Sequence, residues 1–167
     1  LVRGRSFTLR VPVSVERTDA EGVLFSQGSR SSGQALFIAD GRLQYACTNA
    51  GTEHTVVADE PVTVGRHVFE VSFRRTGPGE GTLDMLGDVT MTIDDRVVGA
   101  ADAVRMTGLD LMQRTCAGRS VTLSVSARYR SPFPFTGGAF DEVVLDFSAG
   151  SGEPDARAVV DTAFARD

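Results

Sequence analysis

Apolar and polar residues alternate along much of this chain, and this alternation limits the fold more than any other feature of the sequence. In the first such stretch, Phe7, Leu9, Val11, Val13 and Val15 alternate with polar or small residues. A period of two is the period of a β-strand that buries one face. The pattern therefore predicts strands that pack against a second sheet.

A proline interrupts this first stretch at position 12. It has no backbone N–H to donate to a neighbouring strand. We therefore expect this strand to lie at the edge of a sheet, or Pro12 to face solvent.

Turn residues divide the alternating stretches at short intervals. Asp40-Gly41 separates the runs QALFIA and RLQYACT and is a strong hairpin signal, and Asp94-Asp95 separates a second pair of runs. We expect about ten to twelve short strands, one of them over residues 121–125, and this pattern predicts an all-β fold with two antiparallel sheets in a sandwich.

The chain has the size of one domain. Its 167 residues can bury a core without disulfides or metals. We assign residues 1–147 to the sandwich and residues 148–167 to a polar linker and C-terminal tail, in which residues 157–165 either form a short helix or stay frayed. The chain begins at Leu1 in a strand-like register, so we expect it to be a piece of a longer polypeptide.

Charge and hydropathy exclude several classes of partner. All 17 basic residues are arginine and 22 residues are acidic, which gives a net charge of −5. This balance does not favour a nucleic-acid partner. No apolar run is long enough to cross a bilayer, so we expect a soluble chain with no membrane partner, and we slightly favour the cytoplasm over export.

Residues for catalysis are scarce. The two histidines, His54 and His67, lie in strand-like sequence, and there is no G-x-S-x-G motif. Cys47 and Cys116 are expected to be reduced, buried thiols, and the spacing of the four residues lacks the close pairs of a zinc site. We therefore expect neither a catalytic residue nor a cofactor in this chain, apart from calcium.

Four aspartates, Asp84, Asp88, Asp94 and Asp95, lie close together in the sequence. Carboxylate oxygens suit Ca²⁺, which many sandwich domains bind at the ends of loops. Because no D-x-D-x-D-G loop is present, two alternatives remain: a calcium site, or turn residues that face water.

The segment YRSPFPFTGGAF precedes the last predicted strand. In one interpretation, Phe133 and Phe135 pack into a corner of the sandwich. In the other, Tyr129 and these phenylalanines form an exposed aromatic platform for a sugar or another domain. Tyr45 and Arg30 are further candidates for contact with a ligand or another domain.

Four segments occur in the order GVLFSQG, QALFIADGRLQY, VVADEPVTVGRHVFEVSF and YRSPFPFTGGAFDEVVLDF. Together they resemble the C-terminal domain of the large bacterial and actinobacterial arylsulfatases. The resemblance runs over residues 20–147, and residues 132–137 are its most specific part. It implies a jelly-roll sandwich similar to concanavalin A-like or laminin G-like domains.

The same resemblance implies a sulfatase catalytic domain as a partner in cis. Sulfatases act through a Cys/Ser-x-Pro-x-Arg motif, whereas Cys116-Ala117-Gly118-Arg119 has no proline and its arginine comes one position early. The resemblance therefore carries no active-site residue over to this chain. We expect a non-catalytic module that packs on the catalytic domain and helps to shape its substrate entrance, with a stand-alone carbohydrate-binding module as the alternative.

Overall fold

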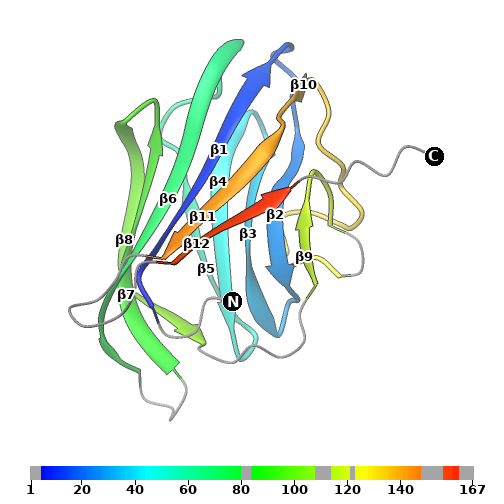
Figure 1. The fold of residues 1–167 in the computed structure, drawn as a ribbon. Helices are drawn as coiled ribbons and strands as arrows, with labels where there is room; N and C mark the ends of the chain where they lie inside the picture. Colours follow the sequence, from blue (N-terminus) through cyan, green and yellow to red (C-terminus); the bar gives the residue numbers. More distant parts are fainter. Residues whose placement is uncertain (1–4, 80–83, 108–113, 121–122, 148–155, 162–167) are drawn as a thin grey trace.

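The computed structural model shows two antiparallel β-sheets that face each other (Figure 1). It describes residues 5–79, 84–107, 114–120 and 123–147, and the backbone of residues 156–161. All regular structure in these residues is strand, which confirms the predicted all-β, two-sheet sandwich, and they contain no helix that could span a membrane. The strands are β1 (Phe7–Val15), β2 (Gly22–Gly28), β3 (Ser32–Ala39), β4 (Arg42–Asn49), β5 (Thr52–Val57), β6 (Gly65–Pro78), β7 (Asp84–Ile93), β8 (Arg96–Thr107), β9 (Thr115–Ala117), β10 (Gly138–Ala139), β11 (Glu142–Phe147) and β12 (Ala156–Asp161).

The two sheets differ in size. The seven-stranded sheet, here called the large sheet, has the order β12-β11-β1-β6-β7-β8, and β10 also pairs with β1. The five-stranded sheet, here called the small sheet, has the order β5-β4-β3-β2-β9. In Figure 1 the large sheet lies in front of the small sheet.

Both predicted hairpins are confirmed. The strands on either side of Asp40-Gly41 pair directly, as do those on either side of Asp94-Asp95. All four turn residues have positive φ angles, of 53° and 69° in the first turn and 51° and 65° in the second. Two such residues in a row match the twist of a tight hairpin, which is why these pairs of residues direct the chain back on itself.

β1 is a central strand, so the edge position expected for Pro12 is wrong. The other alternative holds in part, because Pro12 is half-buried on the outer face of the large sheet, opposite the buried side chains of β1. On the side away from β6, β1 pairs with β10 at Ser14 and Val15 and with β11 at residues 8–10. Between these points residues 11–13 face residues 140–143, so the second segment carries one residue more, which defines a β-bulge. The ladder is interrupted where Pro12 has no N–H to offer, and this interruption makes the proline tolerable.

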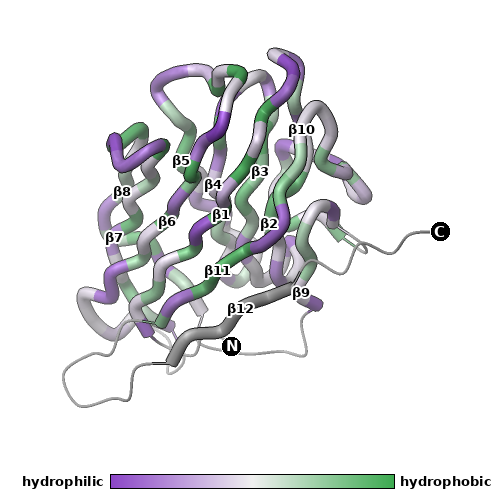
Figure 2. The backbone as a smooth tube through the Cα atoms, turned by 45° about the horizontal axis from the view of Figure 1, so that its top comes forward, coloured by the Kyte–Doolittle hydropathy of each residue, from purple (hydrophilic) through white to green (hydrophobic). Residues whose placement is uncertain are grey.

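The main core lies between the two sheets. Hydrophilic and hydrophobic residues alternate along much of β1 and β6 (Figure 2). Every second residue of β1, and Phe69, Val71 and Phe73 of β6, are buried. The most deeply buried side chains, each at most 1% exposed, include Phe7, Leu9, Phe69, Val71 and Phe73 from the large sheet and Leu24, Phe25, Leu36, Ile38 and Leu43 from the small sheet.

The outer face of the small sheet is also buried. Side chains from the segment between β9 and β10 pack over it, and we call residues 118–120 and 123–137 of that segment the covering segment. Val125, Tyr129 and Phe133 of this segment contact a second apolar cluster on the sheet, which consists of Val23, Ala35, Phe37, Ala39 and Ala46. Residues 123–125 are therefore not part of the strand expected over residues 121–125, and residues 121–122 lie outside the described residues.

The short helix expected in the C-terminal tail is wrong where the chain is described. Residues 156–161 form β12, which pairs with β11 along its whole length. A strand at this position satisfies backbone groups that β11 would otherwise present as an open edge. Residues 148–155 and 162–167 lie outside the described residues, so the boundary between sandwich and tail stays a prediction.

Candidate functional site

Two neighbouring hollows lie at one end of the large sheet, beside the turn between β7 and β8. We call this end the hairpin end. The larger hollow, of about 470 Å³, is lined by Pro12 and Ser14 of β1, by the first residues of β6 and by the chain between β10 and β11. The smaller hollow, of about 300 Å³, includes residues of the loop between β5 and β6. Both are lined by His67 and Asp94, so this pair is the natural place to look for chemistry.

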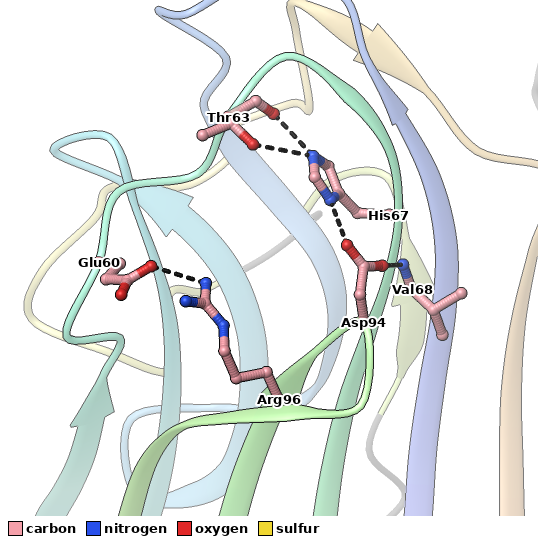
Figure 3. Close-up of polar contacts among 6 residues, drawn as sticks. All are labelled: Glu60, Thr63, His67, Val68, Asp94 and Arg96. Carbon is pink, nitrogen blue, oxygen red and sulfur yellow. Dashed lines mark hydrogen bonds and ion pairs between the residues drawn. The ribbon is translucent and has the colours of Figure 1, made fainter.

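His67 connects three segments of the chain (Figure 3). Its Nδ1–H donates to a carboxylate oxygen of Asp94 at 2.7 Å, and its Nε2 lies 2.9 Å from the carbonyl oxygen of Thr63 and 3.3 Å from the hydroxyl of Thr63. The other carboxylate oxygen of Asp94 accepts the backbone N–H of Val68 at 2.8 Å. The imidazole side chain is 13% exposed, whereas that of Asp94 is 51% exposed.

The order Thr63, His67, Asp94 has the arrangement of a nucleophile, a base and an orienting acid. A catalytic base must keep the lone pair of its second ring nitrogen free for the proton of the hydroxyl. Here Nε2 lies closer to the carbonyl oxygen of Thr63 than to its hydroxyl, so the ring is not directed at the hydroxyl alone. We interpret the three residues as a structural clamp.

The electrostatics of the clamp agree with this interpretation. The hydrogen bond from His67, together with that from the N–H of Val68, lowers the pKa of the Asp94 carboxyl and keeps it ionised. Glu60 in the same loop forms an ion pair with Arg96 of β8 at 2.6 Å (Figure 3). The Glu60–Arg96 pair thus joins the β5–β6 loop to β8, whereas Asp94 holds the start of β6.

The four aspartates considered for calcium do not come together. Asp84 begins β7 and Asp94-Asp95 follows its end, so roughly 30 Å of strand separates them. Asp88 instead accepts from Arg74 at 2.5 Å and from the N–H of Ala103 at 3.3 Å. Among the described residues, no three His, Cys, Asp or Glu side chains lie close enough to hold a metal ion.

Neither tyrosine offers the exposed ring that an aromatic platform requires. Tyr129 is 5% exposed, its ring centroid lies 5.0 Å from that of Phe37, and it stacks on Phe133 at 5.5 Å. Its hydroxyl accepts the N–H of Val125 at 3.1 Å, and burial raises its pKa. Tyr45 is 1% exposed and lies in the main core, where its hydroxyl donates to Gln34 at 2.7 Å.

The remaining candidates lie nearer the surface. Phe133 is half-buried against the outer cluster, whereas Phe135 is half-buried against the main core, with its ring tilted on Phe140 at 5.6 Å. Arg30 is exposed in the turn between β2 and β3. A contact of these three residues with a ligand or another domain stays a prediction.

Glu53 of β5 fastens the covering segment, a role that the sequence did not reveal. Its carboxylate accepts hydrogen bonds from the hydroxyls of Ser126 at 2.5 Å and Thr55 at 2.9 Å, and from the N–H of Ala127 at 2.9 Å. Partial burial by itself raises the pKa of Glu53, but these bonds and the nearby charge of Arg128 outweigh it, so the net shift is downward. The outer face of the small sheet is thus held closed.

Both cysteines are free, as expected, but they differ in exposure. Cys47 is buried in the main core, and burial raises the pKa of its thiol to about 12. Cys116 lies half-buried on the edge strand β9. A raised pKa leaves almost no thiolate, so Cys47 is not poised as a nucleophile.

Of the comparisons with known proteins, the one with solved structures bears on the fold. No protein-family model and no curated protein matches the chain. Among solved structures it is similar to domains LG4-5 of the mouse laminin α1 chain, with a TM-score of 0.57 and 14% identity, over 93% of this chain and 41% of that chain. This chain thus spans less than half the length of that structure.

At this level of identity the likeness defines the fold alone. The chain has a β-sandwich fold similar to that of these laminin domains, which agrees with the expected laminin G-like jelly-roll sandwich. The comparisons contain no sign of an arylsulfatase origin.

Proposed function

We propose that this chain is a non-catalytic module of an arylsulfatase-like protein and that it packs on a catalytic domain of the same polypeptide. The four sequence segments that resemble arylsulfatase C-terminal domains support this origin. The structural bonds of His67 and Asp94 support the absence of catalysis, because they occupy the groups that a reaction at the hairpin end would use.

One observation carries the packing role: exposed valines gather at the hairpin end. Val64, Val68 and Val97 are 52%, 37% and 60% exposed. Val64 precedes β6, Val68 lies near the start of β6 and pairs with Pro12, and Val97 lies near the start of β8. Because the start of β6 and the start of β8 both flank the end of β7, these residues share one end of the sheet.

The covering segment strengthens this choice of surface. It occupies the outer face of the small sheet, so that face is closed to a partner. The large sheet keeps an accessible outer face on which apolar residues are bordered by charged ones such as Arg66 and Asp94. An apolar centre with a polar rim is the usual composition of an interface between domains.

The test compares this chain with the longer polypeptide that contains it. Hydrogen exchange at the start of β6 and β8 is expected to be slower in the longer polypeptide. The substitutions Val68→Asp and Val97→Asp should remove that protection, whereas Leu123→Asp, at a 63% exposed site on the covering segment, should not. Equal exchange in the two forms, or an upstream reading frame without a Cys/Ser-x-Pro-x-Arg motif, would refute the proposal.

A second candidate function is carbohydrate binding, favoured by a different observation. A hollow of about 330 Å³ lies far from the hairpin end, and Asn49, His54 and Asp84 line it. The side chains of these three residues make no hydrogen bond or ion pair within the described chain. Titration with neutral sugars tests this candidate directly, and a complete lack of binding would exclude it.

A further inference from the structure

The hollow of about 330 Å³ lies where the two sheets approach each other, at the end of the large sheet opposite the hairpin end. Its lining comes from the end of β4 and the start of β5, and from the start of β7 and the later part of β8. The residues that matter for its chemistry are Asn49, Thr52, His54, Asp84, Leu86 and Arg105.

Asn49 is the most informative of these residues. The whole residue is 7% exposed, and its amide makes no hydrogen bond within the described chain but reaches solvent, because Ser32 Oγ is the one fully buried unpaired side-chain polar atom in the described residues. Its neighbour Thr48, which faces the other side of the sheet, donates to the carbonyl oxygen of Val125 at 3.0 Å. Water in the hollow can hydrate this amide, and the hydroxyl of a ligand can replace that water. An unpaired amide at the wall of a hollow is therefore available to a ligand.

His54 and Asp84 add two more unpaired polar groups. His54 pairs with Cys47 across β4 and β5, so it lies on the face of the small sheet that looks toward the large sheet. Asp84 reaches the same hollow from the first position of β7. Asn49, His54 and Asp84, which lie on three strands, thus line one hollow.

The backbone is irregular at the same place. Gly87 pairs with Val104 and Val89 with Ala101, so the single residue Asp88 on β7 faces two residues on β8, which defines a bulge. One of these two, Ala103, lines the hollow and has a φ angle of 53°. A residue other than glycine rarely adopts positive φ, and such bulges often redirect side chains beside binding sites.

We propose that this hollow binds one sugar unit of a neutral glycan. Asp84 can accept from hydroxyl groups, and Asn49, Thr52 and His54 can each donate and accept, so the site offers both partners that a hydroxyl needs. Leu86 supplies apolar surface for the C–H face of a sugar ring. The volume lies within the range of small-molecule pockets, about 300–1,000 Å³.

The charges of the site argue against ionic ligands. Asp84 would repel an anion, and Arg105, which already has a partner, would repel a cation. A neutral molecule with many hydroxyl groups avoids both penalties. This site rests on the second candidate function, carbohydrate binding, and gives that function a location.

The test is an NMR titration of the isotope-labelled chain with D-glucose, D-galactose and D-mannose, each used alone. Saturable shifts are expected at the side-chain amide of Asn49 and along the start of β5. Asp84→Asn should raise the apparent Kd about tenfold, because it removes a charged acceptor of hydrogen bonds from the sugar hydroxyls. Asp95→Asn removes the same charge at the far end of β7 and should leave Kd within about twofold.

The outcomes separate the site from the function. If a sugar binds but neither Asp84→Asn nor Asn49→Ala weakens binding, the site is wrong and carbohydrate binding stands. If none of the three sugars gives a saturable shift anywhere in the spectrum, both are wrong. Thermal melting of each variant shows whether a loss of binding comes from unfolding, and Asp84→Asn, at a half-buried position, carries the test if Asn49→Ala does not fold.

Discussion

Glu53 is expected to be the strongest single polar anchor of the covering segment. Glu53→Ala removes the acceptor of three hydrogen bonds, two of which come from Ser126 and Ala127 of that segment. The hydroxyl of Ser126, a residue with 0% exposure, would lose its acceptor and keep only the bond that it accepts from the N–H of Arg128, at a cost of about 1–2 kcal/mol. The loss of the bond from Ala127 adds about 1 kcal/mol, whereas Thr55 can turn to water. We therefore expect a total loss of about 2–3 kcal/mol.

Urea unfolding at neutral pH measures this loss, with tyrosine fluorescence as the signal. The chain has no tryptophan and two tyrosines, and both are buried, one in each apolar layer. Glu60→Ala is the matched control because the Glu60–Arg96 ion pair is 57% and 62% exposed, and it should cost less than about 1 kcal/mol. If the two variants unfold at the same urea concentration, the anchoring role of Glu53 is refuted.

The pH dependence gives an independent check of Glu53. Its folded-state pKa is lowered, so its ionised form stabilises the fold above the unfolded pKa, about 4.3. This contribution is lost as the pH falls from there through the folded pKa. The difference in stability between the native chain and Glu53→Gln should therefore be constant at neutral pH and shrink below about pH 4.3. A difference that grows in acid would contradict the reasoning.

Three further predictions concern other parts of the fold. Phe37→Ala should cost about 3–5 kcal/mol in urea unfolding, because Phe37 is 0% exposed beneath the covering segment, and a cost below about 1 kcal/mol would mean that this layer is not packed. Asp94→Asn keeps the turn but weakens the bond to His67, so it should lower the free energy of unfolding by about 1 kcal/mol at neutral pH. The loss should be smaller in acid, where the native Asp94 also becomes protonated, and an equal loss at all pH values would contradict the clamp. With a thiol reagent, Cys116 should react in the folded chain and Cys47 only on unfolding, and equal rates would contradict the burial of Cys47.

The hairpins show what local sequence predicts well. Asp40-Gly41 and Asp94-Asp95 favour left-handed backbone at two successive positions, and that preference needs no distant partner. The alternation in β1 and β6 is equally local, because side chains on a strand alternate wherever the strand lies. These features were sufficient to predict the two-sheet sandwich.

The second apolar layer was harder to foresee, although one signal for it exists. The run ALFIA in β3 does not alternate, and Phe37 faces the covering segment while its neighbours Leu36 and Ile38 face the main core. An uninterrupted apolar run is typical of a strand that is buried on both faces. The residues that cover this face, however, lie about 90 positions later in the sequence, as Tyr129 does.

Sequence alone determined the class of fold, since periodicity and turn preference act between neighbours along the chain. Tertiary structure decided which polar side chains form hydrogen bonds within the chain and which remain available to a ligand. His67 and Asp94, 27 positions apart, satisfy each other, whereas Asn49 and Asp84, from strands of different sheets, share a hollow without a partner. Hydrogen bonding and burial depend on distances in space, and no spacing along the sequence specifies those distances.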